Sequence, residues 1–422
     1  MPHPGHHDRG LTLAAPTGDR IAVVGASLAG MRAAETLRRE GFAGTITLVG
    51  AETHWPPVDR PPLSKQLLAG TWDLDRSRLR TTLDPANDGR LDLRLGRRAV
   101  DADVATGELT LDDGATVGFD GLVVATGGTP RRLPRVGDLA GTHLLRTVDD
   151  SLALRTDLER GARLAVVGAG FIGCEVAVAA RHFGCQVDVV EALPLPLVRV
   201  LGEQVGQMAA DLHRENGVTL HLGVGVEAIE GDDRVTGVRL TTGALIEADA
   251  LVVGIGVTPA TEWLAGTDLV IDNGVSCDET LAAHGAANVV AAGDVARWPN
   301  PAFGGAVMRI EHWTNAAEQG EHAAITLLRS LAGGTPEPEP FVSVPYFWSD
   351  QYGVRLQMLG VWAEHDDVHV AEGDPLAGER RGVLAFVRDG VVTGALCVNR
   401  ASRTLKWRKA IAERATWPLP SE

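Results

Sequence analysis

Two short glycine-rich segments constrain the fold of this chain more than any other feature of its sequence. The first covers residues 25–30 and follows the apolar run at residues 21–24. The second covers residues 168–173 and follows the apolar run at residues 164–167. Each is followed by a helical pattern of apolar residues and then by another apolar run, which predicts a strand–turn–helix–strand unit. Such a unit with glycines at the turn is typical of dinucleotide binding, so we expect two dinucleotide-binding domains in one chain.

The glycines of these segments have a physical purpose. A pyrophosphate binds to backbone N–H groups at the N-terminus of a helix, and a large side chain there would block its approach. Ser27 takes the place of the middle glycine in the first segment, and its small side chain can itself donate to phosphate. The predicted ligands are Gly25, Ser27, Leu28, Ala29 and Gly30 in the first unit, and Gly168, Gly170, Phe171, Ile172 and Gly173 in the second.

Each unit also carries a glutamate near the end of its second apolar run, Glu52 in the first unit and Glu191 in the second. A carboxylate at this position accepts hydrogen bonds from the ribose hydroxyls and repels a 2′-phosphate. Glu191 therefore favours NADH over NADPH. Arg199 is close to Glu191 in the sequence, and its positive charge would weaken that preference.

The rest of the pattern divides the chain into further parts. Each unit is followed by hairpin signals and then by an apolar strand that ends in small residues, at 125–127 and at 254–256. A further apolar strand ends at Gly293 and Asp294, and residues 333–340 have the composition of a linker. We predict a flexible tail at residues 1–18, a first domain at 19–128 that returns at 257–332, a second domain at 129–256 and a C-terminal domain at 333–422.

Composition excludes several classes of function. The chain has 55 acidic and 39 basic side chains and a net charge of -16, which argues against binding to nucleic acids or acidic membranes. No apolar stretch is long enough to span a bilayer and no signal-peptide pattern is present, so we expect a cytoplasmic protein. The cysteines Cys174, Cys185, Cys277 and Cys397 form no close pair, so neither a metal site nor a redox disulfide is indicated.

Several further segments carry a resemblance to a known family. In chain order they are Asp59-Arg60-Pro61-Pro62-Leu63-Ser64-Lys65, Ala125-Thr126-Gly127, Ala292-Gly293-Asp294-Val295, Glu311-His312-Trp313-Thr314-Asn315-Ala316 and Tyr346-Phe347-Trp348-Ser349-Asp350-Gln351. Over residues 19–415 the chain resembles the FAD-dependent ferredoxin reductases of bacterial oxygenase systems, the putidaredoxin reductase and rubredoxin reductase type. One departure is Val58, where a tyrosine is usual.

The resemblance implies a fold class. It is an α/β fold with two Rossmann-like dinucleotide-binding domains of the glutathione-reductase type, within the pyridine nucleotide-disulfide oxidoreductase superfamily, plus an α+β C-terminal domain. The first domain would bind FAD and the second NADH. Asp294 would bind the ribityl chain of FAD, and Arg60 would lie near its phosphates. Further contacts are implied for Ala125, Thr126, Gly127 and Gly293 with FAD, and for Gly254, Ile255 and Gly256 with the nicotinamide.

Four side chains are implied as catalytic. Lys65 and Glu175 would meet beside the isoalloxazine ring, and Trp313 and Trp348 would border the flavin. The sequence supports the first pair independently, because Glu175 lies in the first turns of an otherwise apolar helix and should be buried. A buried carboxylate needs a partner. Large aromatic rings beside the flavin would exclude water and give the cofactor a flat wall.

The activity implied is a ferredoxin reductase. NADH would give a hydride to FAD N5, and electrons would then pass singly to a 2Fe–2S ferredoxin that serves a monooxygenase or dioxygenase. The C-terminal stretch at residues 401–415 is basic in an otherwise acidic protein, and it could steer an acidic carrier to its docking site. The predicted docking residues are Arg403, Lys406, Arg408 and Lys409. We expect a monomer or a weak homodimer.

Two alternatives stay open at this point. The first is a rubredoxin reductase or a reductase that acts on disulfides or peroxide through a cysteine. The cysteine chemistry needs a thiol over the flavin, and residues 53–80, where such a thiol is usual, contain none. The second is a flavoprotein that senses NADH and acts by interaction, like the apoptosis-inducing-factor relatives of this fold.

Overall fold

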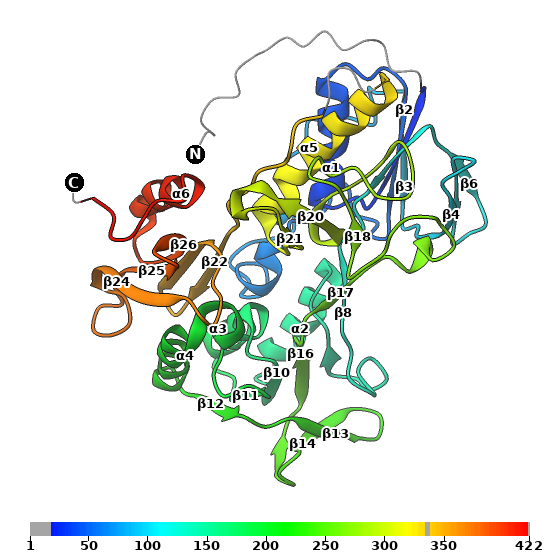
Figure 1. The fold of residues 1–422 in the computed structure, drawn as a ribbon. Coiled ribbons are helices and arrows are strands. Elements are labelled where there is room, and N and C mark those ends of the chain that lie inside the picture. The colour runs from blue at the N-terminus through cyan, green and yellow to red at the C-terminus, as the bar shows by residue number, and fades with distance from the viewer. Residues whose placement is uncertain (1–17, 334–337, 421–422) are drawn as a thin grey trace.

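The computed structural model describes residues 18–333 and 338–420. The predicted tail at residues 1–18 therefore lies outside the described residues except for its last position, and the predicted linker lies partly outside them. Figure 1 shows three parts: the first unit with the segment that returns to it, the second unit below, and the C-terminal part at one side. No helix in the described ranges is both long and apolar enough to cross a membrane.

The first part is a parallel sheet of five strands in the order β19-β7-β1-β2-β3. Helices α1 (Leu28–Arg39) and α5 (Trp313–Leu331) pack side by side against it (Figure 1). The strands are β1 (Arg20–Val24), β2 (Thr45–Gly50), β3 (Leu91–Leu95), β7 (Gly121–Val124) and β19 (Val289–Ala291). Because β19 comes from the predicted return, residues 257–332 rejoin the sheet formed by residues 19–128. The exact domain boundaries stay a prediction.

The second part repeats this plan with a parallel sheet in the order β12-β11-β10-β16-β9. Its strands are β9 (Thr142–His143), β10 (Leu164–Val167), β11 (Val187–Glu191), β12 (Val218–Leu222) and β16 (Ala250–Val253). Its helices are α2 (Val148–Glu159), α3 (Phe171–His182) and α4 (Val198–Glu215). Both units expected from the glycine-rich segments are therefore present.

Short strands, most of them paired antiparallel, join and extend the two parallel sheets. β8 (Gly128–Pro130) pairs with β17 (Val257–Pro259), so the two connections between the units run side by side. The expected hairpin stretches are β4 (Ala99–Asp103), β5 (Glu108–Leu111) and β6 (Thr116–Gly118), and β13 (Val226–Gly231), β14 (Val235–Leu240) and β15 (Leu245–Glu247). A third small sheet contains β18 (Val275–Ser276), β20 (Ala296–Asn300) and β21 (Ala306–Met308).

The C-terminal part is an antiparallel sheet in the order β22-β23-β26-β25-β24, with one helix packed against it. Its elements are β22 (Tyr346–Gln351), β23 (Val354–Gly360), β24 (Asp367–Asp374), β25 (Arg381–Arg388), β26 (Val391–Val398) and α6 (Thr404–Ala412). Trp407 of α6 is 2% exposed and anchors the helix to the sheet. The predicted α/β fold class with an α+β C-terminal domain is confirmed.

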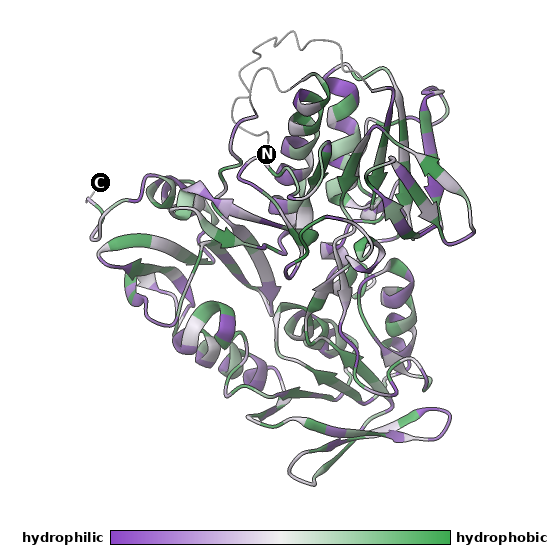
Figure 2. Cartoon of the chain, turned by 45° about the vertical axis from the view of Figure 1, so that its right-hand side comes forward, coloured by the Kyte–Doolittle hydropathy of each residue, from purple (hydrophilic) through white to green (hydrophobic). Residues whose placement is uncertain are grey.

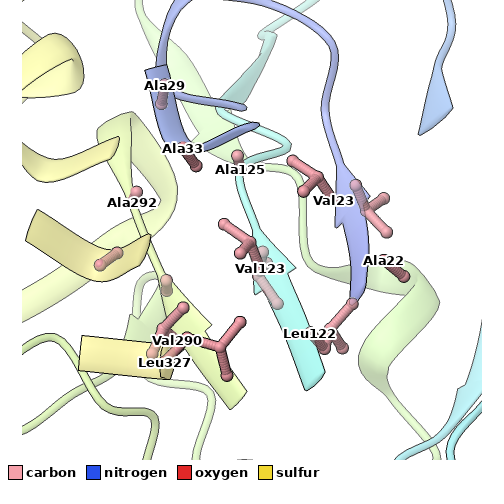
Figure 3. Close-up of a cluster of buried hydrophobic side chains, with 14 of the residues drawn as sticks. Ala22, Val23, Ala29, Ala33, Leu122, Val123, Ala125, Val290, Ala292 and Leu327 are labelled. Atoms are coloured by element: carbon pink, nitrogen blue, oxygen red, sulfur yellow. The ribbon is translucent and has the colours of Figure 1, made fainter. Parts of the chain in front are cut away.

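Small residues let the first unit pack closely. Ala29 and Ala33 of α1 lie among Val123 and Leu327 in the core (Figure 3). A Cβ on Gly320 of α5 would lie 2.2 Å from the carbonyl oxygen of Ala29, so the two helices can approach this closely only with glycine there. Figure 2 shows hydrophobic colour along the strands of both parallel sheets and both hydrophobic and hydrophilic colour on the helices that cover them, as amphipathic helices over buried sheets require.

Candidate active site

One cavity of about 760 Å³ brings the three parts of the chain together. Its walls come from both glycine-rich turns, from the short helix η1 (Pro61–Ser64), from the N-terminus of α5 and from β22. Both parallel sheets face it with the carboxyl ends of their strands, where ligands bind in open α/β sheets. The cavity is therefore placed where a ligand of one sheet would meet a ligand of the other.

Most of the predicted site residues line this cavity. They are Ser27, Leu28, Ala29, Arg60, Lys65, Ala125, Gly127, Gly293, Asp294, Trp313 and Trp348, and, from the second unit, Gly168, Gly170, Phe171, Ile172, Glu175, Glu191, Arg199, Gly254, Ile255 and Gly256. Five predicted residues do not line it: Gly25, Gly30, Glu52, Thr126 and Gly173. The structure gives a separate physical reason for each of these five.

The three glycines outside the cavity wall serve close backbone packing. A Cβ on Gly25 would lie 2.1 Å from the carbonyl oxygen of Ala125. A Cβ on Gly30 would lie 1.8 Å from the carbonyl oxygen of Gly25, and a Cβ on Gly173 would lie 1.9 Å from the carbonyl oxygen of Gly168. Real Cβ atoms do not approach an oxygen so closely. These glycines hold each turn against its helix and its neighbouring strand. Our prediction that they also contact the ligand stays a prediction.

Thr126 and Glu52 are occupied by partners within the protein. The Thr126 hydroxyl donates to the carbonyl oxygen of Ala260 at 2.7 Å and so links the two connections between the units. The Glu52 carboxylate pairs with the guanidinium of Arg60, which does line the cavity. Glu52 therefore acts on the cavity through Arg60 in this structure, rather than from its wall.

The middle position of each turn leaves room for a phosphate. Ser27 is the N-cap residue of α1, yet its side chain makes no capping hydrogen bond and lines the cavity. Gly170 is the N-cap residue of α3, and a Cβ there would meet nothing within 4 Å. A free hydroxyl at one helix N-terminus and an open space at the other both fit an anionic pyrophosphate.

Glu191 stands at the cavity wall and is held by its own turn. Its carboxylate accepts backbone hydrogen bonds from Ala169 at 2.7 Å and from Leu193 at 2.9 Å. These two donors fix the position of the charge beside the cavity. Arg199 lines the same region, as the sequence suggested.

A cluster of positive charge lies beside Asp294. The Arg146 guanidinium is 3.4 Å from the Asp294 carboxylate, and Arg60 donates a hydrogen bond to the Arg146 carbonyl oxygen. Burial, with a contribution from the nearby Arg146 charge, lowers the pKa of Arg60. The Nε atom of Arg60 is buried and has no partner among the described residues, which fits an anionic ligand such as the FAD phosphates. Sequence reasoning missed Arg146, because it lies outside every motif.

Lys65 and Glu175 meet at the junction of the two units. The Lys65 ammonium lies 2.7 Å from the Glu175 carboxylate, whose residue is only 3% exposed. The hydroxyls of Ser64 at 2.5 Å and Ser349 at 2.7 Å also donate to this carboxylate. Lys65 and Ser64 from one segment and Ser349 from another therefore all donate to the buried carboxylate of Glu175. Sequence reasoning missed both serines as functional residues, although each lies in a segment that carried the family resemblance.

Aromatic rings close the cavity on the side of the C-terminal part. The rings of Trp313 and Trp348 lie 6.3 Å apart at 69°, and the Trp313 indole donates to Asp59 at 2.6 Å. Burial raises the pKa of Asp59. On the opposite face of β22, Phe347 contacts His312 at 4.7 Å between ring centres, and burial lowers the pKa of His312 to about 4. These rings give the cavity an apolar wall from which water is largely excluded.

All four cysteines are buried, and none lines the cavity. Burial raises the pKa of Cys277 and that of Cys397 to about 12, and it also raises the pKa of Cys174 and Cys185. A thiol with such a raised pKa is a poor nucleophile at neutral pH. The site therefore offers no thiol for disulfide or peroxide chemistry.

Two dinucleotide cradles that share one cavity, with a buried Lys–Glu pair and no thiol, define a class of flavin- and nicotinamide-dependent reductases. Residues 19–320 match the model of the pyridine nucleotide-disulphide oxidoreductase family, and residues 346–420 match that of the reductase C-terminal domain. The chain belongs to the pyridine nucleotide-disulphide oxidoreductase family. The predicted family and the use of FAD and NAD(H) by its members are confirmed.

Similar proteins narrow the class further. Rhodocoxin reductase of Rhodococcus erythropolis is 41% identical over 93% of this chain and 89% of that protein. The ferredoxin–NAD(+) reductase component of the p-cumate 2,3-dioxygenase system of Pseudomonas putida is 37% identical over 94% of each chain. A crystal structure of the covalent putidaredoxin reductase–putidaredoxin complex matches with a TM-score of 0.86, 32% identity and coverage of 94% of this chain and 93% of that chain. The roles of the individual site residues stay predictions.

Proposed function

We propose that this protein is an NADH-dependent ferredoxin reductase that supplies electrons to a 2Fe–2S ferredoxin of an oxygenase system. The observation that supports the proposal is the single cavity lined by both glycine-rich turns, because a nicotinamide held by one turn would reach a flavin held by the other. The names of the similar proteins support a ferredoxin as the electron acceptor. The buried thiols argue against the cysteine-dependent alternative.

The chain's own residues would bind and orient the two dinucleotides. Ser27, Arg60 and Asp294 would hold FAD through its phosphates and ribityl chain. Gly170 and Glu191 would hold NADH through its pyrophosphate and ribose. When bound, FAD accepts a hydride from the nicotinamide and releases the electrons singly.

The residues at the junction would prepare the site for that transfer. The Lys65 ammonium, held by Glu175, places a positive charge at the cavity wall, where it would stabilise negative charge that develops on the flavin. Trp313 and Trp348 would exclude water and orient the ring. None of these residues forms a covalent bond with substrate, so their contribution is positioning and electrostatics.

The docking site is a finer part of the proposal. Three of the predicted basic residues have acidic partners within the chain: Arg403 with Glu372 at 2.8 Å, Arg408 with Glu318 at 3.7 Å and Lys409 with Glu413 at 3.8 Å. Their charge is thus partly compensated, and we expect weaker steering than the sequence alone suggested. Lys409 and Leu405 are more than 70% exposed on α6 and offer both charge and apolar surface to an acidic carrier.

The proposal is tested with the native protein under anaerobic conditions. NADH should bleach the visible flavin absorbance, and a 2Fe–2S ferredoxin should restore it faster than a rubredoxin does. Faster transfer to rubredoxin would favour a rubredoxin reductase. Slow transfer to every carrier would favour a flavoprotein that senses NADH and acts by interaction. A protein that retains no FAD would contradict the proposal itself.

Charge reversal separates docking from catalysis. Lys409→Glu should slow reduction of the ferredoxin several-fold at low salt, with reduction of ferricyanide unchanged. Arg214→Glu is a matched control, because Arg214 is, like Lys409, an exposed basic residue paired near its own helix end, with Asp211 at 3.3 Å, but it lies on α4. Equal losses in the two variants would exclude α6 as the docking site.

A further inference from the structure

The first strand of the C-terminal sheet directs alternate side chains toward the second dinucleotide-binding unit. Phe347 contacts Phe171 of α3, Ser349 donates to Glu175 of α3, and Gln351 contacts His213 of α4. Ser349 and Gln351 are fully buried, and His213 is 1% exposed. Polar groups without access to water are costly unless each is hydrogen-bonded. This buried polar row therefore needs an explanation beyond packing.

These side chains form one continuous hydrogen-bonded chain that ends at Glu175. The Tyr352 hydroxyl lies 3.3 Å from His213 Nδ1, and His213 Nε2 lies 3.2 Å from Gln351 Oε1. Gln351 Nε2 lies 3.3 Å from Ser349 Oγ, which lies 2.7 Å from Glu175 Oε1. We call Tyr352, His213, Gln351 and Ser349 the relay row.

The partners assign the direction of every proton in the relay row. Glu175 is an acceptor, so the Ser349 hydroxyl donates to it and accepts from the Gln351 amide. The Gln351 oxygen must then accept from His213 Nε2–H, which leaves Nδ1 as the acceptor of the Tyr352 hydroxyl. Burial lowers the pKa of His213 to about 4 and raises that of Tyr352, so both stay neutral as this order requires. All donors point toward Glu175, and each strengthens the next.

The backbone at Tyr352 gives a second, independent observation. Tyr352 and Gly353 form the turn between β22 and β23, both with positive φ, 48° and 78°. Such a turn strongly prefers asparagine or aspartate at its first position, and a bulky residue there is strained. The strained position is nevertheless occupied by the residue whose hydroxyl and ring both contact His213, with 5.2 Å between ring centres. Strain of this kind is tolerated where it serves a site.

We propose that the relay row consists of positioning residues that fix the Glu175 carboxylate and, through it, the Lys65 ammonium for hydride transfer. The C-terminal sheet thereby supports the reduction of FAD by NADH, in addition to any contact that it makes with the electron carrier. The inference rests on the proposed function of the Lys65–Glu175 pair. Ser349 is the direct donor, and the other members keep its hydroxyl directed at Glu175 rather than at another acceptor.

The test is the single-turnover rate of FAD reduction by saturating NADH. Ser349→Ala should lower this rate about tenfold, because one hydrogen bond to a buried charge is lost. Tyr352→Phe removes only the farthest hydroxyl and should lower it two- to threefold. The apparent Kd for NADH and the reoxidation by ferricyanide should stay unchanged in both. Ser349→Thr, which keeps the hydroxyl, should restore most of the rate.

Ser77→Ala is the matched control, because Ser77 is a buried serine whose hydroxyl donates only to the Asp73 carbonyl oxygen. It should reduce FAD at the native rate. Native rates in Ser349→Ala and Tyr352→Phe, or an equal loss in Ser77→Ala, would overturn the inference while the proposed function stands. A native protein that binds FAD but is not reduced by NADH would overturn both. Because Tyr352→Phe preserves packing, it decides the matter even if a substitution at Ser349 prevents folding.

Discussion

The two dinucleotide-binding units share one backbone frame. In each, the first glycine of the turn donates its N–H to the second strand at 2.8 Å, from Gly25 to Val49 and from Gly168 to Val190. A Cβ on the first glycine would strike a neighbouring carbonyl oxygen at 2.1 Å in one unit and 2.3 Å in the other. The same backbone contacts therefore demand glycine at the same positions twice.

The units differ where they face the ligand. The middle turn position is Ser27 in the first unit and Gly170 in the second. The acid of the first unit, Glu52, pairs with the guanidinium of Arg60, eight residues further along the chain, whereas Glu191 is held by backbone N–H groups. The comparison teaches that the frame is fixed by backbone sterics, and we predict that a few side chains placed on it set the identity of the ligand.

The largest effect is expected from a methyl group on the last glycine of either turn. Gly30→Ala and Gly173→Ala would each place a Cβ less than 2 Å from a backbone oxygen. Overpacking against backbone costs about 3 kcal/mol, so both variants should lose that much free energy of unfolding, measured with urea. The visible spectrum separates them, because Gly30→Ala should lose FAD, while Gly173→Ala should keep FAD but resist reduction by NADH. Loss of FAD in both variants would mean that the units are not independent cradles.

Substitutions of the two acids, Glu191 and Glu52, should differ by about tenfold in their effect on the preference for NADH over NADPH. Glu191→Gln removes the charge that repels a 2′-phosphate, so kcat/KM for NADPH should rise about tenfold relative to NADH. Glu52→Gln makes the same chemical change in the other unit, and it should leave this ratio unchanged because Glu52 does not line the cavity. Steady-state kinetics with both nucleotides measure the ratio. A similar shift in the two variants would contradict the assignment of NADH to the second unit.

Each dinucleotide-binding unit also has an ion pair at the start of its first strand. Asp120 pairs with Arg20 at 2.9 Å, and Asp249 pairs with Arg163 at 2.8 Å. Hydrogen bonding to Arg163 lowers the pKa of Asp249 from 3.8 to about 2, and Arg20 lowers that of Asp120 as well. A carboxylate whose pKa is lowered by folding stabilises the protein above its unfolded pKa, and this stabilisation is lost as the pH falls through the folded value.

Removing these carboxylates therefore has a pH-dependent effect. Asp249→Asn should lower the free energy of unfolding by about 1 kcal/mol at pH 7, a value limited by solvent screening of a half-exposed pair. The difference from the native protein should shrink between pH 4 and pH 2. Asp120→Asn should behave in the same way with a smaller effect. Urea unfolding at pH 7 and pH 3 measures both, and a difference that grows at acid pH would contradict the assignment.

Much of this architecture could be predicted because its signals are local. The apolar run at residues 21–24 became β1 (Arg20–Val24), and the apolar surroundings of Glu175 correctly indicated its burial. The strand predicted to end at Asp294 is shorter, since β19 ends at Ala291 and a turn of 3₁₀ helix follows. The strand ends there because Gly293 takes a positive φ of 79° and begins the turn, although the Ala292 N–H still donates to the Val124 carbonyl oxygen at 2.9 Å.

The contacts of the site could not be predicted where they join distant segments without a local pattern. Ser349 meets Glu175 across 174 positions of the sequence, and a single serine carries no periodic signal. Arg146 meets Asp294 only after the second unit is inserted into the first. Two acidic partners of the basic C-terminal stretch, Glu318 and Glu372, likewise come from other elements, so the local charge overstated the positive potential.

The smallest effect is expected from exchanging the middle turn residues. At position 170 a Cβ meets nothing within 4 Å and φ is -75°, so Gly170→Ser should fold with a change in free energy of unfolding below about 0.5 kcal/mol. Ser27→Gly should be similarly mild, because the Ser27 hydroxyl makes no capping hydrogen bond within the protein. Any measurable change should therefore appear in ligand affinity, with FAD released more readily by Ser27→Gly in a dialysis assay. Destabilisation of the ligand-free protein by either exchange would show that the middle position belongs to the backbone frame rather than to ligand recognition.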